Sequence, residues 1–242
     1  MQNPTAMNNR LISCLVTLPV LLLLAACGSS GKYVRQGDNI FYTYWTFSFG
    51  QRYDTVHGAD AATFHSVKDW VGADKDHVFY RDRLVDGADP ATLQVERRPL
   101  MRDQNDYYYQ ATAMHVASVS TFKVLQWFED DFYARDSRYA YYDTVRFEAD
   151  LTTFKVKGIF VAVDCNHVYR FGKVLPLADP ATYDECWQGF YSRDKAHIWY
   201  MGDLVKDADY ATFTVDGNSE AHDKYGRFSH AERITGEADD AE

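Results

Sequence analysis

Short runs in which apolar and polar residues alternate recur through most of the chain. Residues 153–156 (Thr-Phe-Lys-Val) alternate with a period of two, which is typical of a strand with one buried face. The runs 167–171 and 197–201 are followed by Gly172-Lys173 and Gly202-Asp203 and then by further apolar residues. This order predicts short hairpins that turn at the glycine-containing pairs. Tyr, Phe, Val and Thr are frequent, which also favours strands.

A six-residue stretch with Ala first and Thr fifth recurs at a nearly fixed interval. Its copies occupy residues 59–64, 88–93, 117–122, 149–154, 178–183 and 208–213. From each Ala to the next the steps are 29, 29, 32, 29 and 30 residues. A fixed period of this size is the signature of a repeat architecture. The surplus in the longest step falls in residues 125–132, the one internal departure from the period.

The stretch itself predicts a tight turn followed by an apolar anchor. Five copies carry an aspartate in the second position: Asp60, Asp89, Asp150, Asp179 and Asp209. Such an aspartate accepts a hydrogen bond from a backbone N–H two or three residues on, and a following Pro fixes φ where its missing N–H costs least. The last residue of each copy is predicted to reach a shared core: Phe64, Leu93, Phe122, Phe154, Tyr183 and Phe213.

A repeat of about 30 residues is too small to bury its own apolar face, so neighbouring repeats have to cover one another. The fold class predicted is therefore mainly β, with tandem meander or hairpin repeats stacked as a solenoid-like array. A closed, propeller-like ring is the alternative. The predicted organisation is a leader over 1–26, a flexible tether over 27–37 and a single β-repeat domain over 38–239.

A second landmark lies about fifteen residues before the next turn in each repeat. Its copies span residues 74–80, 103–109, 136–142, 164–170 and 194–200, and Asp223 opens a degraded one. Asp74-Lys75, Asp194-Lys195 and the run Asp103-Gln104-Asn105 with its three following tyrosines resemble parts of the motif that names the bacterial DKNYYY family. The resemblance covers most of the chain. It implies a repeat protein of the cell envelope and no assigned activity.

The N-terminus reads as a lipoprotein leader. Arg10 precedes an apolar run over 11–24, which is too short for a stable membrane span. Leu24-Ala25-Ala26-Cys27 resembles a bacterial lipobox, which implies cleavage before Cys27 and lipid on that residue. Gly28 follows it, and the resemblance then favours the outer membrane, facing the periplasm or the cell surface. An ordinary secretory signal is the alternative.

Charge and cysteine content narrow the partners. The formal charge is −10 without a basic cluster, which argues against nucleic acid or an anionic membrane surface as a partner, since both require a basic face. Once Cys14 leaves with the leader and Cys27 is acylated, Cys165 and Cys186 remain in a compartment that allows disulfides. We expect these two to be bridged.

The sequence carries no recognised catalytic spacing, and we expect no catalytic residue, metal site or cofactor. His77, His167 and His197 fall at one equivalent place, which the repeat explains by itself. Each tyrosine triplet should leave at least one ring facing out or into a groove, and exposed aromatic rows bind proteins or glycans. The favoured hypothesis is a non-enzymatic, lipid-anchored binding or scaffolding protein with a protein or glycan partner. The alternatives are an envelope hydrolase or metal-dependent enzyme, and an ion-binding structural repeat protein.

Overall fold

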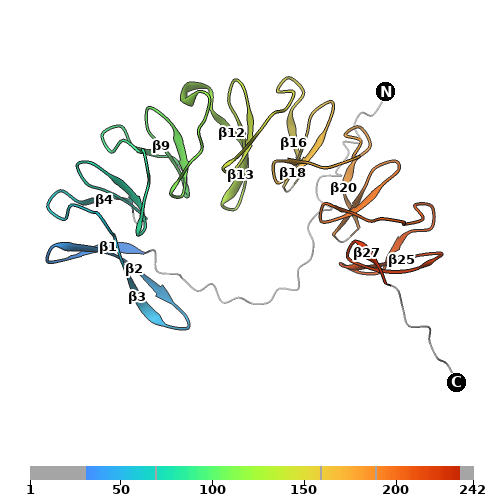
Figure 1. The fold of residues 1–242 in the computed structure, drawn as a ribbon, viewed down its shortest axis with the longest axis horizontal. Helices are drawn as coiled ribbons and strands as arrows, with labels where there is room; N and C mark the ends of the chain where they lie inside the picture. The colour runs from blue at the N-terminus through green and yellow to red at the C-terminus, as the bar shows by residue number, and fades with distance from the viewer. Residues whose placement is uncertain (1–30, 69, 159, 189, 235–242) are drawn as a thin grey trace, which may run out of the picture. The chain divides into compact units, whose positions relative to one another are not determined.

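The computed structural model describes residues 31–68, 70–158, 160–188 and 190–234. These residues divide into two compact units, each described by itself below. One contains residues 31–162 and 171–173, and the other contains residues 163–170 and 174–234. The described residues form seven small sheets, with one 3-10 turn and no α-helix (Figure 1).

Three antiparallel strands make the first sheet, in the order β1-β2-β3: β1 (Lys32–Gln36), β2 (Asn39–Thr46) and β3 (Gly50–Thr55). The predicted flexible tether over 27–37 is therefore shorter than expected. Residues 32–36 pair with β2 from Lys32 opposite Thr43 to Gln36 opposite Asn39. The tether's Gly and Ser content hid a strand whose hydrogen bonds come from a partner further along the chain.

Four-stranded sheets follow one after another along the chain (Figure 1). The next three are β4 (His65–Lys68), β5 (Val71–Ala73), β6 (Val78–Tyr80) and β7 (Arg83–Leu84); β8 (Gln94–Val95), β9 (Leu100–Arg102), β10 (Tyr107–Tyr109) and β11 (Thr112–Ala113); and β12 (Lys123–Phe128), β13 (Asp131–Arg135), β14 (Ala140–Tyr142) and β15 (Val145–Phe147). The 3-10 turn η1 (Val119–Thr121) stands where the third copy of the repeated turn is predicted.

The last three sheets repeat the same pattern. They are β16 (Lys155–Gly158), β17 (Val161–Val163), β18 (Val168–Arg170) and β19 (Lys173–Val174); β20 (Asp184–Gln188), β21 (Tyr191–Arg193), β22 (Ile198–Tyr200) and β23 (Asp203–Leu204); and β24 (Thr214–Val215), β25 (Glu220–Asp223), β26 (Gly226–Ser229) and β27 (Glu232–Arg233). Consecutive strands are neighbours in every sheet, so each is a simple meander.

Each meander has one strand more than the sequence pattern predicted. The extra strand, β5 in the second sheet and its equivalents, lies between the strand after the repeated turn and the landmark strand. It escaped notice because three residues such as Val71-Gly72-Ala73 are too few to show a period. All three are buried, so this is a central strand with both faces covered.

The hairpin turns fall one residue earlier than predicted. Tyr200 pairs with Asp203, so the turn is Met201-Gly202, with φ of 50° and 104°. Phe171 and Gly172 also have positive φ, of 51° and 74°. Two-residue hairpin turns whose twist matches the strands need positive φ at their central residues, and Gly serves the second position here. The glycine thus marks the end of the turn, where the sequence analysis had placed its beginning.

The cores lie between consecutive sheets. Within one unit, Tyr80 of β6 clusters with Met101 of β9, and Leu100 of β9 clusters with Phe132 of β13. Within the other, Tyr200 of β22 clusters with Phe228 of β26. Within the first unit, β9 therefore supplies residues to two cores, one on each side of its sheet. The predicted fold class, a mainly β array of mutually covering repeats, is confirmed.

Candidate functional site

A buried aspartate opens each landmark, and we call these side chains the hub aspartates. They are Asp74, Asp103, Asp136, Asp164, Asp194 and Asp223. Asp103 is fully buried, and its Oδ1 accepts the backbone N–H groups of Asn105 at 2.7 Å and Asp106 at 2.8 Å. Its Oδ2 accepts the N–H of Asp89 at 2.7 Å and the hydroxyl of Tyr108 at 3.0 Å. One carboxylate thus joins the repeated turn to the landmark hairpin.

The same joint recurs with little change. The backbone N–H of Asp60 donates to Asp74 at 2.8 Å, that of Asp179 to Asp194 at 2.9 Å, and that of Asp209 to Asp223 at 2.8 Å. In the third copy, which lacks the turn aspartate, Ala117 donates to Asp136 at 2.7 Å instead. The third copy therefore makes the joint with the N–H of its first residue, one position earlier than the other copies, and without a turn aspartate.

Hydrogen bonds keep four of the hub carboxylates, those of Asp74, Asp103, Asp136 and Asp194, ionised although they are buried. Burial by itself would raise the pKa of Asp103, but the N–H groups of Asp89, Asp106 and Asn105 and the Tyr108 hydroxyl outweigh it. The pKa of Asp103 is therefore lower than usual. Asp74, Asp136 and Asp194 show the same balance of burial against donated hydrogen bonds. A buried carboxylate that accepts several hydrogen bonds is held in place by its donors, and its lowered pKa makes it a weak proton acceptor.

The predicted turn aspartates lie at the surface of these joints. Oδ1 of Asp89 accepts the N–H of Ala91 at 2.9 Å, and its Oδ2 accepts the Thr92 hydroxyl at 2.8 Å. Equivalent bonds reach Asp60, Asp150, Asp179 and Asp209. The landmark lysine also pairs with the turn aspartate, at 4.0 Å for Lys75–Asp60, 2.8 Å for Lys195–Asp179 and 2.7 Å for Lys224–Asp209. Such exposed pairs contribute little to stability.

The landmark tyrosines mostly point inward. Tyr108, Tyr141 and Tyr169 donate their hydroxyls to the hub aspartates Asp103, Asp136 and Asp164 at 3.0, 2.6 and 2.7 Å. Tyr107 and Tyr142 are also buried, and Tyr109 is half-buried. In the tyrosine triplet 107–109 two rings are buried and the third is partly exposed, so this strand presents no row of outward-facing tyrosines. Strands with both faces covered have no solvent side to offer.

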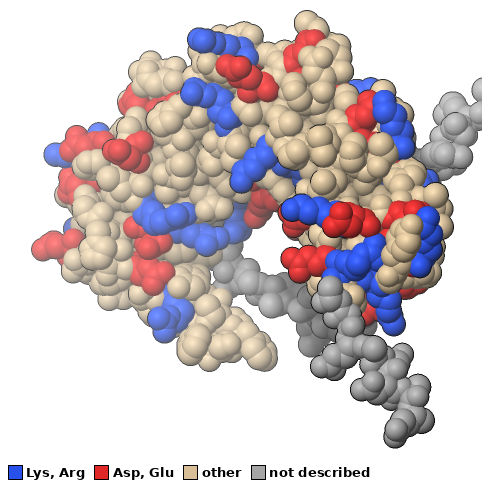
Figure 2. All heavy atoms as spheres, turned by 45° about the vertical axis from the view of Figure 1, so that its right-hand side comes forward, with Lys and Arg blue, Asp and Glu red and all other residues tan. Residues whose placement is uncertain are grey.

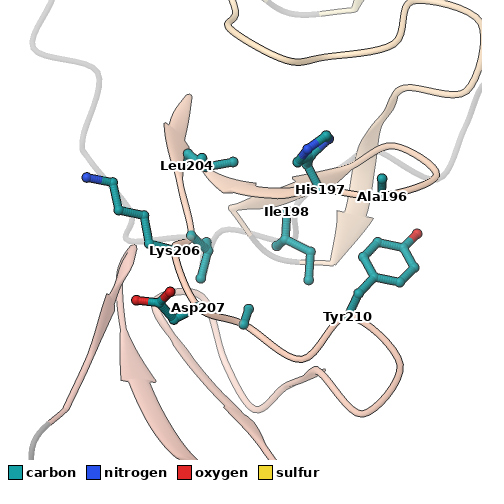
Figure 3. A pocket seen from close by; sticks show the side chains of 9 residues that line it. Ala196, His197, Ile198, Leu204, Lys206, Asp207 and Tyr210 are labelled. Carbon is teal, nitrogen blue, oxygen red and sulfur yellow. The ribbon is translucent and has the colours of Figure 1, made fainter.

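A pocket of about 350 Å³ lies in the sixth repeat, between the β22–β23 hairpin and the turn that follows it (Figure 3). Ile198, Leu204 and Val205 make its apolar part, while Lys206 and Asp207 are exposed on its rim. The Tyr210 ring also lines it, held by a 2.6 Å bond from its hydroxyl to the carbonyl of Asp194. A fixed ring beside charged groups can contact a sugar or a peptide.

Two carboxyl groups lie together beside the surplus segment. Asp131 begins β13, and both its oxygens accept tyrosine hydroxyls, from Tyr109 at 3.3 Å and from Tyr142 at 3.1 Å. Asp143 follows β14 and accepts the N–H of Phe132 at 2.9 Å. Burial, with smaller contributions from the charge of Asp131 and a hydrogen bond to it, raises the pKa of Asp143 to about 7. The hydrogen bonds from Tyr109, Tyr142 and the Phe132 N–H therefore give Asp131 and Asp143 a structural role in this sheet.

A family model described as the DKNYY family matches residues 33–203, which is more than half of the chain. The chain belongs to the DKNYY family. No curated protein and no solved structure matches it. In this DKNYY chain the pairs Asp74-Lys75 and Asp194-Lys195, which match the first two letters of the motif, are a hub aspartate and the lysine that pairs with the repeated turn.

The hub aspartates are the residues that sequence reasoning missed. The sequence pattern predicted that the turn aspartates organise each repeat. The carboxylate that joins the turn to the hairpin is instead the hub aspartate of the landmark. Its signal was available, because Asp74, Asp103, Asp194 and Asp223 follow their turn aspartates by 14 or 15 residues, and only Asp136, in the longest repeat, follows its donor Ala117 by 19. A polar side chain that recurs at a fixed offset from a turn is a candidate acceptor for that turn.

The apolar residues that end each repeated turn lie at the cores between sheets. Phe64, Leu93 and Phe122 are half-buried and pack against the clusters around Phe79, Met101 and Phe132, respectively. Tyr183 and Phe213 are buried. Phe154 is half-buried and packs on Tyr133 and Phe147.

The predictions for Cys27 and Cys186 concern atoms that lie outside the described part of the structure. Cys27 lies outside the described residues, and so does the side chain of Cys186. Cys165 is exposed. The disulfide between Cys165 and Cys186 and the acylation of Cys27 therefore stay predictions.

The three landmark histidines take equivalent places as the repeat implies. Each donates its backbone N–H to the hub aspartate at 2.7 Å, as His77 does to Asp74. Over residues 31–234, apart from those not described, no three His, Cys, Asp or Glu side chains gather as a metal site would require. In the same part of the chain, no helix has the length and apolar character to cross a membrane.

Proposed function

We propose that this protein is a lipid-anchored component of the bacterial cell envelope, and that its repeats form a non-enzymatic binding or scaffolding surface for a protein or a glycan. Acylation of Cys27 anchors it to the outer membrane, on the periplasmic side or at the cell surface. Nucleic acid is not a partner.

The observation that carries the proposal is the use made of the recurrent polar residues. The groups from which an active site would be drawn are bonded within the joints: Asp103 accepts from Asp89 and Tyr108, Asp89 accepts from Thr92, and Lys195 pairs with Asp179. Because these polar groups bond to one another, they hold the repeats rigid, and a rigid array can present a fixed surface to a partner. Extended repeat arrays commonly serve as binding surfaces.

The pocket beside Tyr210 is the place on the repeats where a partner would bind. Its apolar part offers contact area, and Lys206 and Asp207 offer one charge of each sign on the rim. Among the described residues, Tyr210 combines an exposed ring with a hydroxyl already fixed by the Asp194 carbonyl. A fixed ring loses little entropy when a sugar or a peptide packs on it.

Two measurements test the proposal. Mass spectrometry of protein purified from membranes should find acyl chains on Cys27, and Cys27→Ser should leave the membrane fraction. A photo-crosslinking residue at position 206 should capture a defined envelope protein or glycan, and Lys206→Glu should reduce binding of that captured partner. Lys155→Glu, an exposed lysine on β16, is the matched control. An unacylated protein refutes the anchor, and equal capture in both variants refutes the binding surface.

A further inference from the structure

The two most exposed aromatic side chains of the described residues, Phe47 and Phe49, lie at the end of the β2–β3 hairpin, and two further exposed rings lie beside them. Phe47 is 90% exposed, Phe49 75%, Tyr53 54% and Trp45 45%. Residues 39–53 contain no Asp or Glu, although the chain has 35 acidic residues. The hairpin end is therefore apolar and lacks the acidic side chains that are frequent elsewhere in the chain.

The hairpin leaves its core part-way along β2. Ile40 and Tyr42 are buried against Phe79, but from Trp45 onward the side chains contact one another instead. The rings of Trp45 and Phe47 meet edge to face at 6.4 Å, and the Arg52 guanidinium lies 5.8 Å from the Phe49 ring. Exposed apolar groups that cluster in this way mark interaction or membrane sites.

The chain enters the sheet beside this hairpin end. In the register of the first sheet Lys32 lies opposite Thr43, and the Thr43 hydroxyl donates to the Lys32 carbonyl at 3.1 Å. From Thr43, β2 runs on toward Phe47, so the hairpin extends past the start of β1 (Figure 1). Any group attached just before Lys32 therefore starts from the aromatic end of the sheet.

The reach of the chain before Lys32 matches the length of the projecting hairpin. Cys27 precedes Lys32 by five residues, which span at most about 17 Å when fully extended. The four residues from Thr43 to Phe47 advance about 14 Å along a strand. Acyl chains on Cys27 can thus be embedded in a bilayer only if the hairpin end is close to that bilayer.

We propose that the end of the β2–β3 hairpin, residues 45–53, docks into the interfacial layer of the lipid bilayer beside the acyl anchor. The inference rests on the lipid anchoring proposed above. Trp, Tyr and Phe rings favour the headgroup region because they have an apolar body and, in Trp and Tyr, a polar edge. A second contact beside an acyl chain strengthens membrane attachment. Lys32 and Arg52 are exposed on the same sheet toward the hairpin end and suit phosphate headgroups.

The size and charge of the patch favour a bilayer over a second copy of the chain. At roughly 200 Å² per ring and the exposures above, the four side chains offer about 500 Å². A stable protein interface buries about 800 Å² on each partner. Figure 2 shows acidic and basic residues interspersed over the repeats and a tan protrusion at the lower edge of the molecule, where the hairpin ends. A bilayer needs no complementary surface of fixed shape.

Tryptophan quenching by brominated lipids tests the docking. Acylated protein purified from membranes is reconstituted into phosphatidylethanolamine–phosphatidylglycerol vesicles that carry bromine on the acyl chains. The quenching due to Trp45 is the difference between the protein and its Trp45→Phe variant. We expect Trp45 to be quenched, and quenching to fall by at least about twofold in Phe47→Ser/Phe49→Ser, which removes apolar area from the hairpin end. Tyr225→Ser, an equally exposed ring on the last sheet, should leave it unchanged.

The outcomes separate this inference from the proposed anchor. Acylated, vesicle-bound protein whose Trp45 is not quenched overturns the docking and leaves the anchor intact. Unacylated protein whose Trp45 is still quenched overturns the anchor and supports the docking. A dimer in sedimentation that dissociates in Phe47→Ser/Phe49→Ser overturns the docking in favour of a second copy. The melting temperature of the double variant, compared with that of Tyr225→Ser, shows that the hairpin change leaves the fold in place.

Discussion

Replacing a hub aspartate should destabilise the joint between turn and hairpin more than any change to the turn side chain. In Asp103→Ala, three backbone N–H groups and the Tyr108 hydroxyl lose a buried acceptor. A net contribution of about 1 kcal/mol per hydrogen bond gives a loss of about 4 kcal/mol. This is a large share of the 5 to 15 kcal/mol that is roughly typical of a folded domain.

Two further substitutions make the prediction quantitative. Asp103→Asn keeps an oxygen for Asn105 and Asp106 but turns an NH₂ group toward the N–H of Asp89, so about 2 kcal/mol should be lost. Tyr108→Phe removes one hydroxyl proton, which lies between Asp103 and the Gly87 carbonyl, and should cost about 1 kcal/mol. The order of stability should therefore be Tyr108→Phe, then Asp103→Asn, then Asp103→Ala.

Urea unfolding combined with hydrogen exchange measures these losses, because a repeat array can open locally before it unfolds as a whole. Exchange of the amides of Asp89, Asn105 and Asp106 should accelerate in Asp103→Ala. Asp86→Asn, an exposed aspartate of the same repeat, is the control and should change stability by less than about 0.5 kcal/mol. If Asp103→Ala behaves like this control, the hub does not hold the turn and the reasoning is refuted.

Three other predictions follow from the same structure. Asp143→Asn should raise the melting temperature at pH 8 and hardly change it at pH 4. The pKa of Asp143 is about 7 in the folded protein, above the usual value for an aspartate, so the stability of the wild type falls as the pH rises toward 7. Over that range Asp143 becomes charged beside Asp131, and the asparagine does not. Gly72→Ala should cost about 1 to 3 kcal/mol, since a Cβ there overlaps the Phe64 ring, whereas Gly217→Ala meets no neighbour and should be neutral. Acid should unfold the protein below about pH 4, because the hub carboxylates have lowered pKa values, so their stabilisation is present above the unfolded value and lost as they are protonated.

Each of these has an outcome that contradicts it. Equal effects of Asp143→Asn at pH 4 and pH 8 would show that Asp143 ionises normally, and Asp130→Asn, at an exposed neighbour, controls for a general change of charge. Similar melting temperatures for the Gly72 and Gly217 variants would mean that Phe64 moves aside without loss. Unchanged stability from pH 6 to pH 3 would show that the hub carboxylates gain nothing from their hydrogen bonds.

Local signals in the sequence were sufficient for the repeat and its turns. The fixed step between copies required a modular fold, and a mainly β array follows from runs too short to be helices. The Asx turns at Asp89 and its equivalents form as predicted, because an aspartate side chain and the N–H two residues on are neighbours in any conformation of the chain.

Tertiary structure decided which side chains are buried and which meet. The Asp103 carboxylate accepts from a turn 14 residues earlier, and Asp131 and Asp143 lie together because β13 and β14 form one hairpin. The tyrosine strands are covered on both faces, while the β2–β3 hairpin extends beyond its core. Sequence alternation reports only that successive side chains point to opposite sides. Whether a side faces water, a neighbouring repeat or another carboxylate depends on residues far along the chain, and only the packed sheets bring those together.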